Sequence, residues 1–156
     1  MKGVNLSMTI QWNKDDLFYV CTMIEYVSRK TNNKSKDVVV RISDKALAHQ
    51  LKVAGINHCL SFEQVADEWI EEFEIPKGNY DNISECRYEV PTVTSIGRVY
   101  QTLISEVVYL YQNVVEAIKK VYSSFISDEI SNYNSSVYYS NPDYIRRSYE
   151  AGKLLD

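Results

Sequence analysis

The sequence predicts an all-α protein, a helical bundle of about six to seven helices. Only five glycines and three prolines interrupt its 156 residues, so long helices are expected. Apolar residues recur three and four positions apart over most of the chain, as they do on one face of a helix. Hydrophobic residues make up 45% and charged residues 24%, which suits a globule with a core. We expect one domain over residues 1–156, with helical subregions at 13–78 and 92–156.

Three helices are expected before residue 58. Asn13 is a good N-cap residue, and apolar side chains follow it at helical spacing, which predicts a helix over residues 14–30. Residues 37–42 contain three consecutive valines and fit either a short strand or a buried helix. We favour the helix because both neighbouring segments look helical. Ser43 can cap a third helix that runs to residues 52–54, with Gly55 as its left-handed C-terminal residue.

Ser61 begins the most strongly patterned helix of the chain. Gln64 lies three residues later, which is the spacing of a capping box. Pro76 and Gly78 are expected to end this helix. Its apolar face consists of Phe62, Val65, Ala66, Trp69, Ile70 and Phe73.

Two polar stretches divide the rest of the chain. Residues 79–91 are expected to form a hinge between the subregions, and alternating apolar and charged residues allow a short extended segment near 85–91. Residues 131–136 form a polar stop. Residues 141–143 then read Asn-Pro-Asp, the signature of a helix N-cap and first turn. This predicts a final short helix to residue 151 that Gly152 closes.

A heptad-like seam lies between these stretches. Two structures fit it. The first is a single helix of more than 30 residues, favoured by the absence of proline. The second is a hairpin broken near Gln112, because Asn113 and Glu116 have capping-box spacing and helices of ordinary length are shorter. The seam residues are Ile96, Tyr100, Leu103, Val107, Leu110, Val114, Ile118, Val121 and Phe125.

Charge is segregated along the chain. Residues 28–60 carry seven Lys/Arg and two Asp/Glu, whereas residues 61–89 carry two and nine. The acids of the helix that Ser61 begins lie opposite its apolar face, which is the usual arrangement of a solvated face. They would equally suit a patch that steers a basic partner, unless the basic segment neutralises them within the fold. The candidates for this contact are Asp67, Glu68, Glu71 and Glu72.

Tyrosine is concentrated in the second half of the chain. Nine of the thirteen tyrosines lie between residues 100 and 149. Tyr100, Tyr111 and Tyr122 lie on or beside the seam, so helix packing explains them. Tyrosine and arginine are over-represented among the residues that dominate protein–protein binding. The last segment therefore supplies the candidate anchors for a partner, with packing inside the bundle as the alternative for each: Tyr138, Tyr139, Tyr144, Arg146, Arg147 and Tyr149.

The sequence carries no recognisable catalytic constellation. His49 and His58 are nine residues apart, a spacing that does not suit a two-histidine metal site on one helix. The three cysteines are widely spaced, which is typical of reduced thiols in a cytoplasmic protein. No phosphate-binding loop, dinucleotide fingerprint or nucleophile elbow occurs. We therefore expect no catalytic residue, no cofactor and no metal.

Charge and hydropathy limit the partners. A net charge of −4 makes a general nucleic-acid binder an unfavoured interpretation, since such proteins are usually basic. No apolar run approaches the roughly 20 residues that a membrane-spanning helix needs. We expect a cytoplasmic protein with no membrane contact.

Residues 15–80 resemble a known group of proteins. The segments DDLFYVCTMIEYVSRKTNNKSKDVVVRISDKALAHQL and NHCLSFEQVADEWIEEFEI are similar to short helical bacterial proteins of unknown function. Members are often encoded beside proteins that resemble ADP-ribosyltransferases. The resemblance implies a neutralising or regulatory partner of a toxin-like enzyme, and it supplies no catalytic residue.

We accordingly expect a non-catalytic, antitoxin-like or regulatory protein whose partner is another protein. One alternative is a structural helical protein that forms a homodimer through the seam at 96–125. Another is an enzyme or small-molecule-binding protein with a tyrosine-lined pocket.

Overall fold

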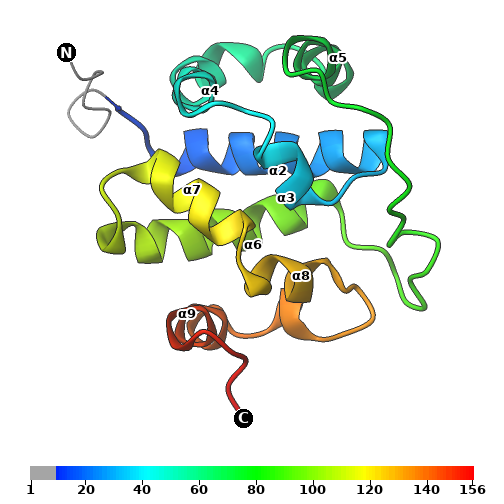
Figure 1. The fold of residues 1–156 in the computed structure, drawn as a ribbon, viewed down its shortest axis with the longest axis vertical. Helices are drawn as coiled ribbons and strands as arrows, with labels where there is room; N and C mark the ends of the chain where they lie inside the picture. The colour runs from blue at the N-terminus through cyan, green and yellow to red at the C-terminus, as the bar shows by residue number, and fades with distance from the viewer. Residues whose placement is uncertain (1–9) are drawn as a thin grey trace.

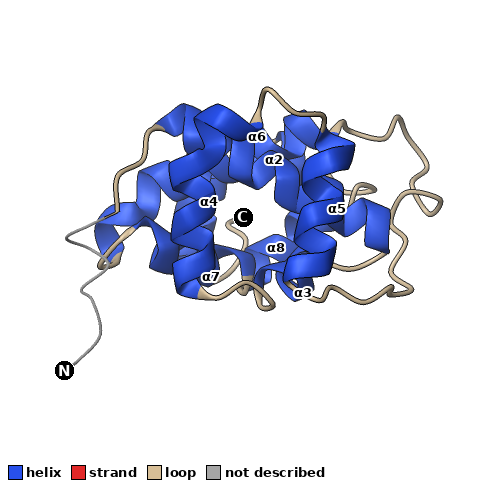
Figure 2. Ribbon diagram, turned by 90° about the horizontal axis from the view of Figure 1, so that it is seen from above, coloured by secondary structure: helices blue, strands red, loops and turns tan. Residues whose placement is uncertain are grey.

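The computed structural model describes residues 10–156, and all regular structure in this range is helical (Figure 1, Figure 2). The all-α prediction is confirmed. Eight α-helices occur in the described range rather than six or seven, because the seam divides into three helices. The elements are α2 (Lys14–Thr31), α3 (Ser35–Val39), α4 (Asp44–Asn57), α5 (Phe62–Glu72), α6 (Val93–Val107), η1 (Val108–Leu110), α7 (Val114–Tyr122), α8 (Phe125–Ser131), η2 (Val137–Tyr139) and α9 (Pro142–Ala151).

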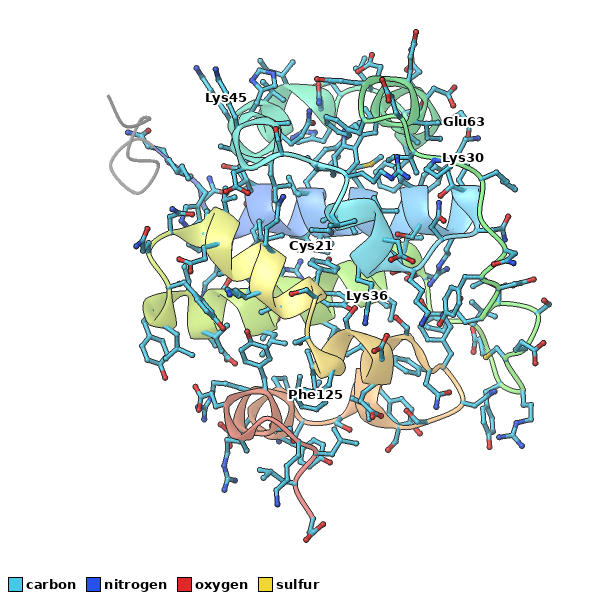
Figure 3. All side chains as sticks on the ribbon, in the orientation of Figure 1. Cys21, Lys30, Lys36, Lys45, Glu63 and Phe125 are labelled. Carbon is cyan, nitrogen blue, oxygen red and sulfur yellow. The ribbon has the colours of Figure 1, made fainter. Side chains whose placement is uncertain are left out.

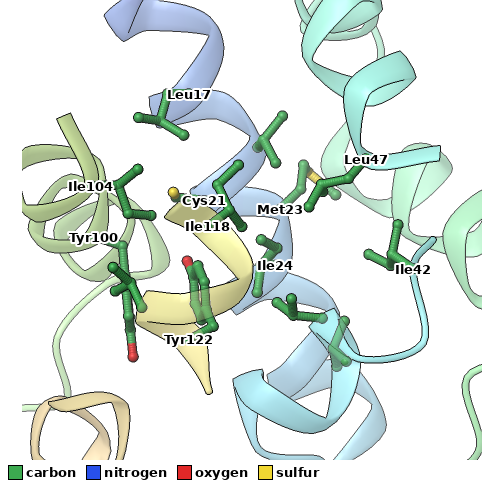
Figure 4. Close-up of a cluster of buried hydrophobic side chains, with 14 of the residues drawn as sticks. Leu17, Cys21, Met23, Ile24, Ile42, Leu47, Tyr100, Ile104, Ile118 and Tyr122 are labelled. Carbon is green, nitrogen blue, oxygen red and sulfur yellow. The ribbon is translucent and has the colours of Figure 1, made fainter. Parts of the chain in front are cut away.

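Helix α2 lies at the centre of the fold. Helices α4 and α5 cover one side of it, α6 packs along another, and α8 and α9 lie beyond α6 (Figure 1). Leu17, Cys21, Met23 and Ile24 of α2 are completely buried, in a cluster that includes side chains from the second half of the chain (Figure 4). The two expected subregions therefore share one hydrophobic core.

The crossing of α2 and α6 depends on a glycine. A Cβ atom at Gly97 would lie 2.3 Å from Thr22 Oγ1 and 2.9 Å from Thr22 Cα. Glycine is the residue that permits so close an approach of two helix backbones. The central contact of the fold is therefore set by Gly97.

Most of the predicted helix ends are confirmed. Asn13 caps α2 and accepts a hydrogen bond from Asp16 N, Ser61 and Gln64 form the capping box of α5, and Gly152 closes α9 in the left-handed conformation. In the segment at 37–42, residues 37–39 are helical, as favoured, and belong to α3, whereas residues 40–42 form a turn and a bend. The prediction for Gly55 is wrong, because α4 continues through it to Asn57.

One further prediction is wrong. Helix α5 ends at Glu72, before Pro76, because Glu74 adopts a left-handed conformation with φ 53°. The stretch at 85–91, where a short extended segment was allowed, contains a turn at Glu85 and a bend at Arg87 and Tyr88, and it forms no strand. Its backbone is hydrogen-bonded to side chains, those of Asn134 and Arg29, as described below.

The seam forms the hairpin alternative rather than one long helix. Asn113 accepts a hydrogen bond from Glu116 N at 2.9 Å and so starts α7. The Glu116 carboxylate accepts from Gln112 N at 2.8 Å, one residue before the position expected for a capping box. The seam side chains are buried within the chain except Leu110, which is 48% exposed, and the half-buried Phe125. A second copy could reach the seam only if these helices separated.

Candidate functional site

Tyr100 and Tyr122 belong to the core. Their rings stack with centroids 4.0 Å apart and planes inclined by 14° (Figure 4). The Tyr100 hydroxyl forms a 2.8 Å hydrogen bond with Ser127 Oγ. Burial raises the pKa of both tyrosines well above the ordinary value. Both side chains act in packing, as the sequence predicts for residues on or beside the seam.

Several of the predicted anchors form contacts with other residues of the chain. Tyr144 donates to Leu155 O at 2.9 Å. The Tyr149 hydroxyl is hydrogen-bonded to that of Tyr111. Arg146 forms ion pairs with Asp143 at 2.5 Å and Glu150 at 3.1 Å. Arg147 alone of the α9 candidates is exposed and has no ion pair within residues 10–156.

The other two predicted anchors, Tyr138 and Tyr139, lie on η2 and line a groove of about 370 Å³. Tyr139 is 69% exposed, and Tyr88, which also lines the groove, is 64% exposed. The ring of Tyr138 makes edge-to-face contacts with Tyr133 and Tyr139, with centroids 5.6 and 4.9 Å apart. We call this feature the tyrosine groove. Its lining is Tyr88, Tyr133, Asn134, Ser135, Ser136, Tyr138 and Tyr139.

Tyr133 fixes the floor of the tyrosine groove to the core. Its hydroxyl donates to Glu25 Oε2 at 2.5 Å and accepts from Arg29 Nη2 at 3.1 Å. Glu25 is 6% exposed and also accepts from Arg29 Nε at 2.9 Å and Ser35 Oγ at 3.2 Å. Burial and then the Glu25 carboxylate raise the pKa of Tyr133 above the ordinary value. This buried charge is therefore paired and hydrogen-bonded, as it must be to be tolerated.

The two sides of the groove are also tied to each other. Asn134 Oδ1 accepts from Arg87 N at 2.7 Å, and Asn134 Nδ2 donates to Glu85 O at 3.0 Å. Arg29 Nη2 donates to Pro91 O at 2.7 Å. These bonds hold the loop that carries Tyr88 against the loop that carries Tyr138 and Tyr139. The sequence interpretation did not include Tyr88 or Tyr133 among the site residues.

A separate small polar cavity lies beside the Glu25 network. Its volume is about 20 Å³, and Glu25, Tyr80, Asn82 and Ser131 are among the residues that line it. This volume holds roughly one water molecule. Burial is the main cause that raises the pKa of Tyr80. The cavity is lined by a carboxylate and by a tyrosine whose pKa is raised, but it has no room for an organic ligand.

The acidic face of α5 is exposed, and α5 lies on the opposite side of α2 from α8 (Figure 1). Lys30 of α2 approaches this face and pairs with Glu63 at 2.6 Å (Figure 3). It lies 4.0 Å from Asp67. The remaining candidates, Glu68, Glu71 and Glu72, form no ion pair within residues 10–156. The basic segment therefore neutralises this face only in part.

Other basic residues of the segment serve different contacts. Lys36 pairs with Asp128 of α8 at 2.8 Å, and Lys34 lies 4.0 Å from the same carboxylate. Arg41 donates to Glu74 O at 3.0 Å. The two lysines connect the first half of the chain to α8, and Arg41 binds the backbone just after α5. These basic side chains are therefore not gathered in one basic patch.

Comparisons with protein families, with curated proteins and with solved structures found no match to this chain. Within the described residues, no group of three or more His, Cys, Asp and Glu side chains is placed to hold a metal ion. No helix in the described range is long and apolar enough to cross a membrane. Cys21, Cys59 and Cys86 are free thiols.

Proposed function

We propose that this chain is a non-catalytic protein-interaction module that binds a polypeptide partner in the tyrosine groove. The observation that carries the proposal is that two exposed tyrosines from distant parts of the chain, Tyr88 and Tyr139, line one groove. Tyrosine offers a large amphipathic contact area at low conformational cost. Burying these rings against a partner would remove apolar surface from water.

The polar lining of the groove supports a polypeptide partner. Asn134, Ser135 and Ser136 line the groove together with the tyrosines. Tyrosine, serine and asparagine are the residues that antibody loops use to bind protein surfaces, with rings for area and short polar groups for hydrogen bonds. A polypeptide presents both apolar side chains and backbone donors to such a lining.

The attachment of the groove to the core supports tight binding. Tyr133 is held by Glu25 and Arg29, and Asn134 joins the two loops. A binding surface that is ordered before the partner arrives loses less entropy on association. The groove therefore needs little rearrangement to bind.

The resemblance of residues 15–80 implies that the partner is a toxin-like enzyme that this chain neutralises or regulates. In that case the exposed acids Glu68, Glu71 and Glu72 provide a second contact for a basic region. The groove is the better-supported contact because Tyr133 and Asn134 of its lining are held in place by hydrogen bonds.

Affinity purification from cells that naturally produce the chain tests this function. We expect the wild-type protein to retain a stoichiometric partner, and Tyr139→Ala and Tyr88→Ala each to weaken its binding about 30-fold, the effect of losing roughly 2 kcal/mol at a binding hot spot. Tyr109→Ala is the matched control, because Tyr109 is also exposed but lies outside the groove. Absence of a stoichiometric partner, or equal loss in all three variants, would contradict the proposal.

A further inference from the structure

An apolar pocket adjoins the tyrosine groove. It lies between α6 and the segment from η2 to α9 and has a volume of about 100 Å³. Tyr138 lines both the pocket and the groove, so a chain bound in the groove can place its next residue in the pocket. The pocket lining includes Arg98, Val99, Leu103, Tyr138, Pro142 and Ile145.

Arg98 is the one charged residue in this lining. Its guanidinium lies over the Phe18 ring, with Cζ 3.9 Å from the ring centroid. Arg98 Nη1 donates to Gln101 Oε1 at 2.7 Å. These two contacts hold the guanidinium in place, as cation–π and hydrogen-bond contacts do.

No carboxylate pairs with Arg98 within residues 10–156. Arg29 and Arg146, by contrast, are both paired with acids in the same range. A guanidinium has five N–H donors in a planar fork that matches a carboxylate. The Arg98 side chain thus borders an apolar pocket, and its guanidinium keeps donors that no internal acid occupies within residues 10–156.

We propose that the pocket binds the C-terminal residue of the partner polypeptide, with a leucine-sized apolar side chain in the pocket and the terminal carboxylate on Arg98. The volume accommodates one such side chain. Because Arg98 lines the pocket itself, the carboxylate must lie close to that side chain. A C-terminal residue carries both groups on one Cα atom, and capture of a terminal carboxylate is a recurring mode of peptide recognition. This inference rests on the proposed function, since it specifies which part of the partner is bound.

Nuclear magnetic resonance titration of the full-length, ¹⁵N-labelled chain tests the inference with defined probes. N-acetyl-leucine is expected to shift the amide signals of Arg98, Val99 and Tyr138. N-acetyl-leucinamide lacks the carboxylate, and N-acetylglycine lacks the apolar side chain. Each is expected to bind about tenfold more weakly, the scale set by a charge-assisted hydrogen bond or by burial of one aliphatic side chain.

Arg98→Gln should abolish the preference for N-acetyl-leucine over its amide. Arg147→Gln is the matched control, because Arg147 is exposed on α9 but does not line the pocket, and it should keep the preference. Equal binding of the acid and the amide to the wild-type chain would overturn the inference. Tighter binding of N-acetyl-leucyl-aspartyl-amide than of N-acetyl-leucine would also overturn it, since the acid would then come from an internal residue.

The two proposals fail separately. If a partner is captured through Tyr139 but N-acetyl-leucine does not bind, the inference that the pocket binds a C-terminal residue is contradicted. The proposal that the tyrosine groove binds a partner then still stands. Binding of N-acetyl-leucine together with no stoichiometric partner would contradict the proposed function and leave the pocket as a carboxylate-binding site.

Discussion

The Tyr133 hydroxyl donates a 2.5 Å hydrogen bond to the Glu25 carboxylate across 108 positions of sequence. Tyr133 is 3% exposed, and its ring borders the tyrosine groove. One side chain therefore satisfies a buried charge of the central helix and supports the proposed binding surface. Loss of this contact should affect both stability and binding.

Tyr133→Phe is expected to lower the free energy of unfolding by about 1–3 kcal/mol, because the buried Glu25 carboxylate loses a donor and gains no other. Urea denaturation followed by circular dichroism measures this change. Tyr139→Phe is the control, since Tyr139 is exposed and removal of its hydroxyl should leave stability within about 0.5 kcal/mol of wild type. Equal stability of Tyr133→Phe and the wild-type chain would show that the Glu25 contact is dispensable.

The chain is expected to lose stability above pH 9. Burial raises the pKa of the Cys21 thiol from its ordinary value of 9.0 to about 12. Between these two pKa values the unfolded chain releases the thiol proton while the folded chain retains it. The folded state is therefore favoured less as pH rises. The expected decrease from this group is about 1 kcal/mol between pH 9 and pH 10. Denaturant titrations at pH 8, 9 and 10 measure it.

Cys21→Ala isolates the contribution of the thiol to this pH dependence. The variant loses some packing and should be less stable at every pH, but its stability should fall less steeply between pH 9 and pH 10. The buried tyrosines add to the fall as pH approaches about 10, the pKa of unfolded tyrosine, but they do so in both proteins, so the difference between the two slopes reports on Cys21. Identical slopes for the variant and the wild-type chain would contradict a buried, protonated Cys21.

Two glycine-to-alanine substitutions should have opposite effects. Gly97→Ala places a Cβ atom 2.3 Å from Thr22 Oγ1, so α2 and α6 must separate, and we expect a loss of about 1–3 kcal/mol. Gly55→Ala places a Cβ atom with nothing within 4 Å, inside α4. There it should stabilise the chain by roughly 0.5–1 kcal/mol through helix propensity. Thermal unfolding of both variants checks the sign, and destabilisation by Gly55→Ala would contradict its place within α4.

The helix starts were predictable from the sequence because a cap depends on residues a few positions apart. Asn13, Ser61 and Asn141 each cap a helix through a backbone N–H within three residues. Gly55 misled the prediction, since a glycine after an apolar run also fits a helix interior. The sequence did not decide between a break near Gln112 and one long helix. The capping residues there favour a break, whereas the continuous apolar seam favours a single helix.

The candidate site was only partly predictable. Tyr138 and Tyr139 were predicted from composition, whereas Tyr88 lies about 50 residues earlier, and only the folded chain brings it to the same groove. The hydrogen bonds of Tyr144 and Tyr149 to Leu155 and Tyr111 involve uncharged partners at no regular spacing. Composition indicates that tyrosine side chains are suited to binding. It does not indicate which tyrosines already form contacts within the folded chain.

Site-specific photo-crosslinking in cells that naturally produce the chain tests the central claim most directly. The photoreactive residue p-benzoylphenylalanine would replace Tyr139 in one variant and Glu72, on the acidic face, in another. If the tyrosine groove is the binding surface, irradiation of the Tyr139 variant should give one discrete adduct with a second protein, whether or not the Glu72 variant gives an adduct through the acidic face. An adduct from Glu72 alone, or from neither position, would contradict binding at the tyrosine groove.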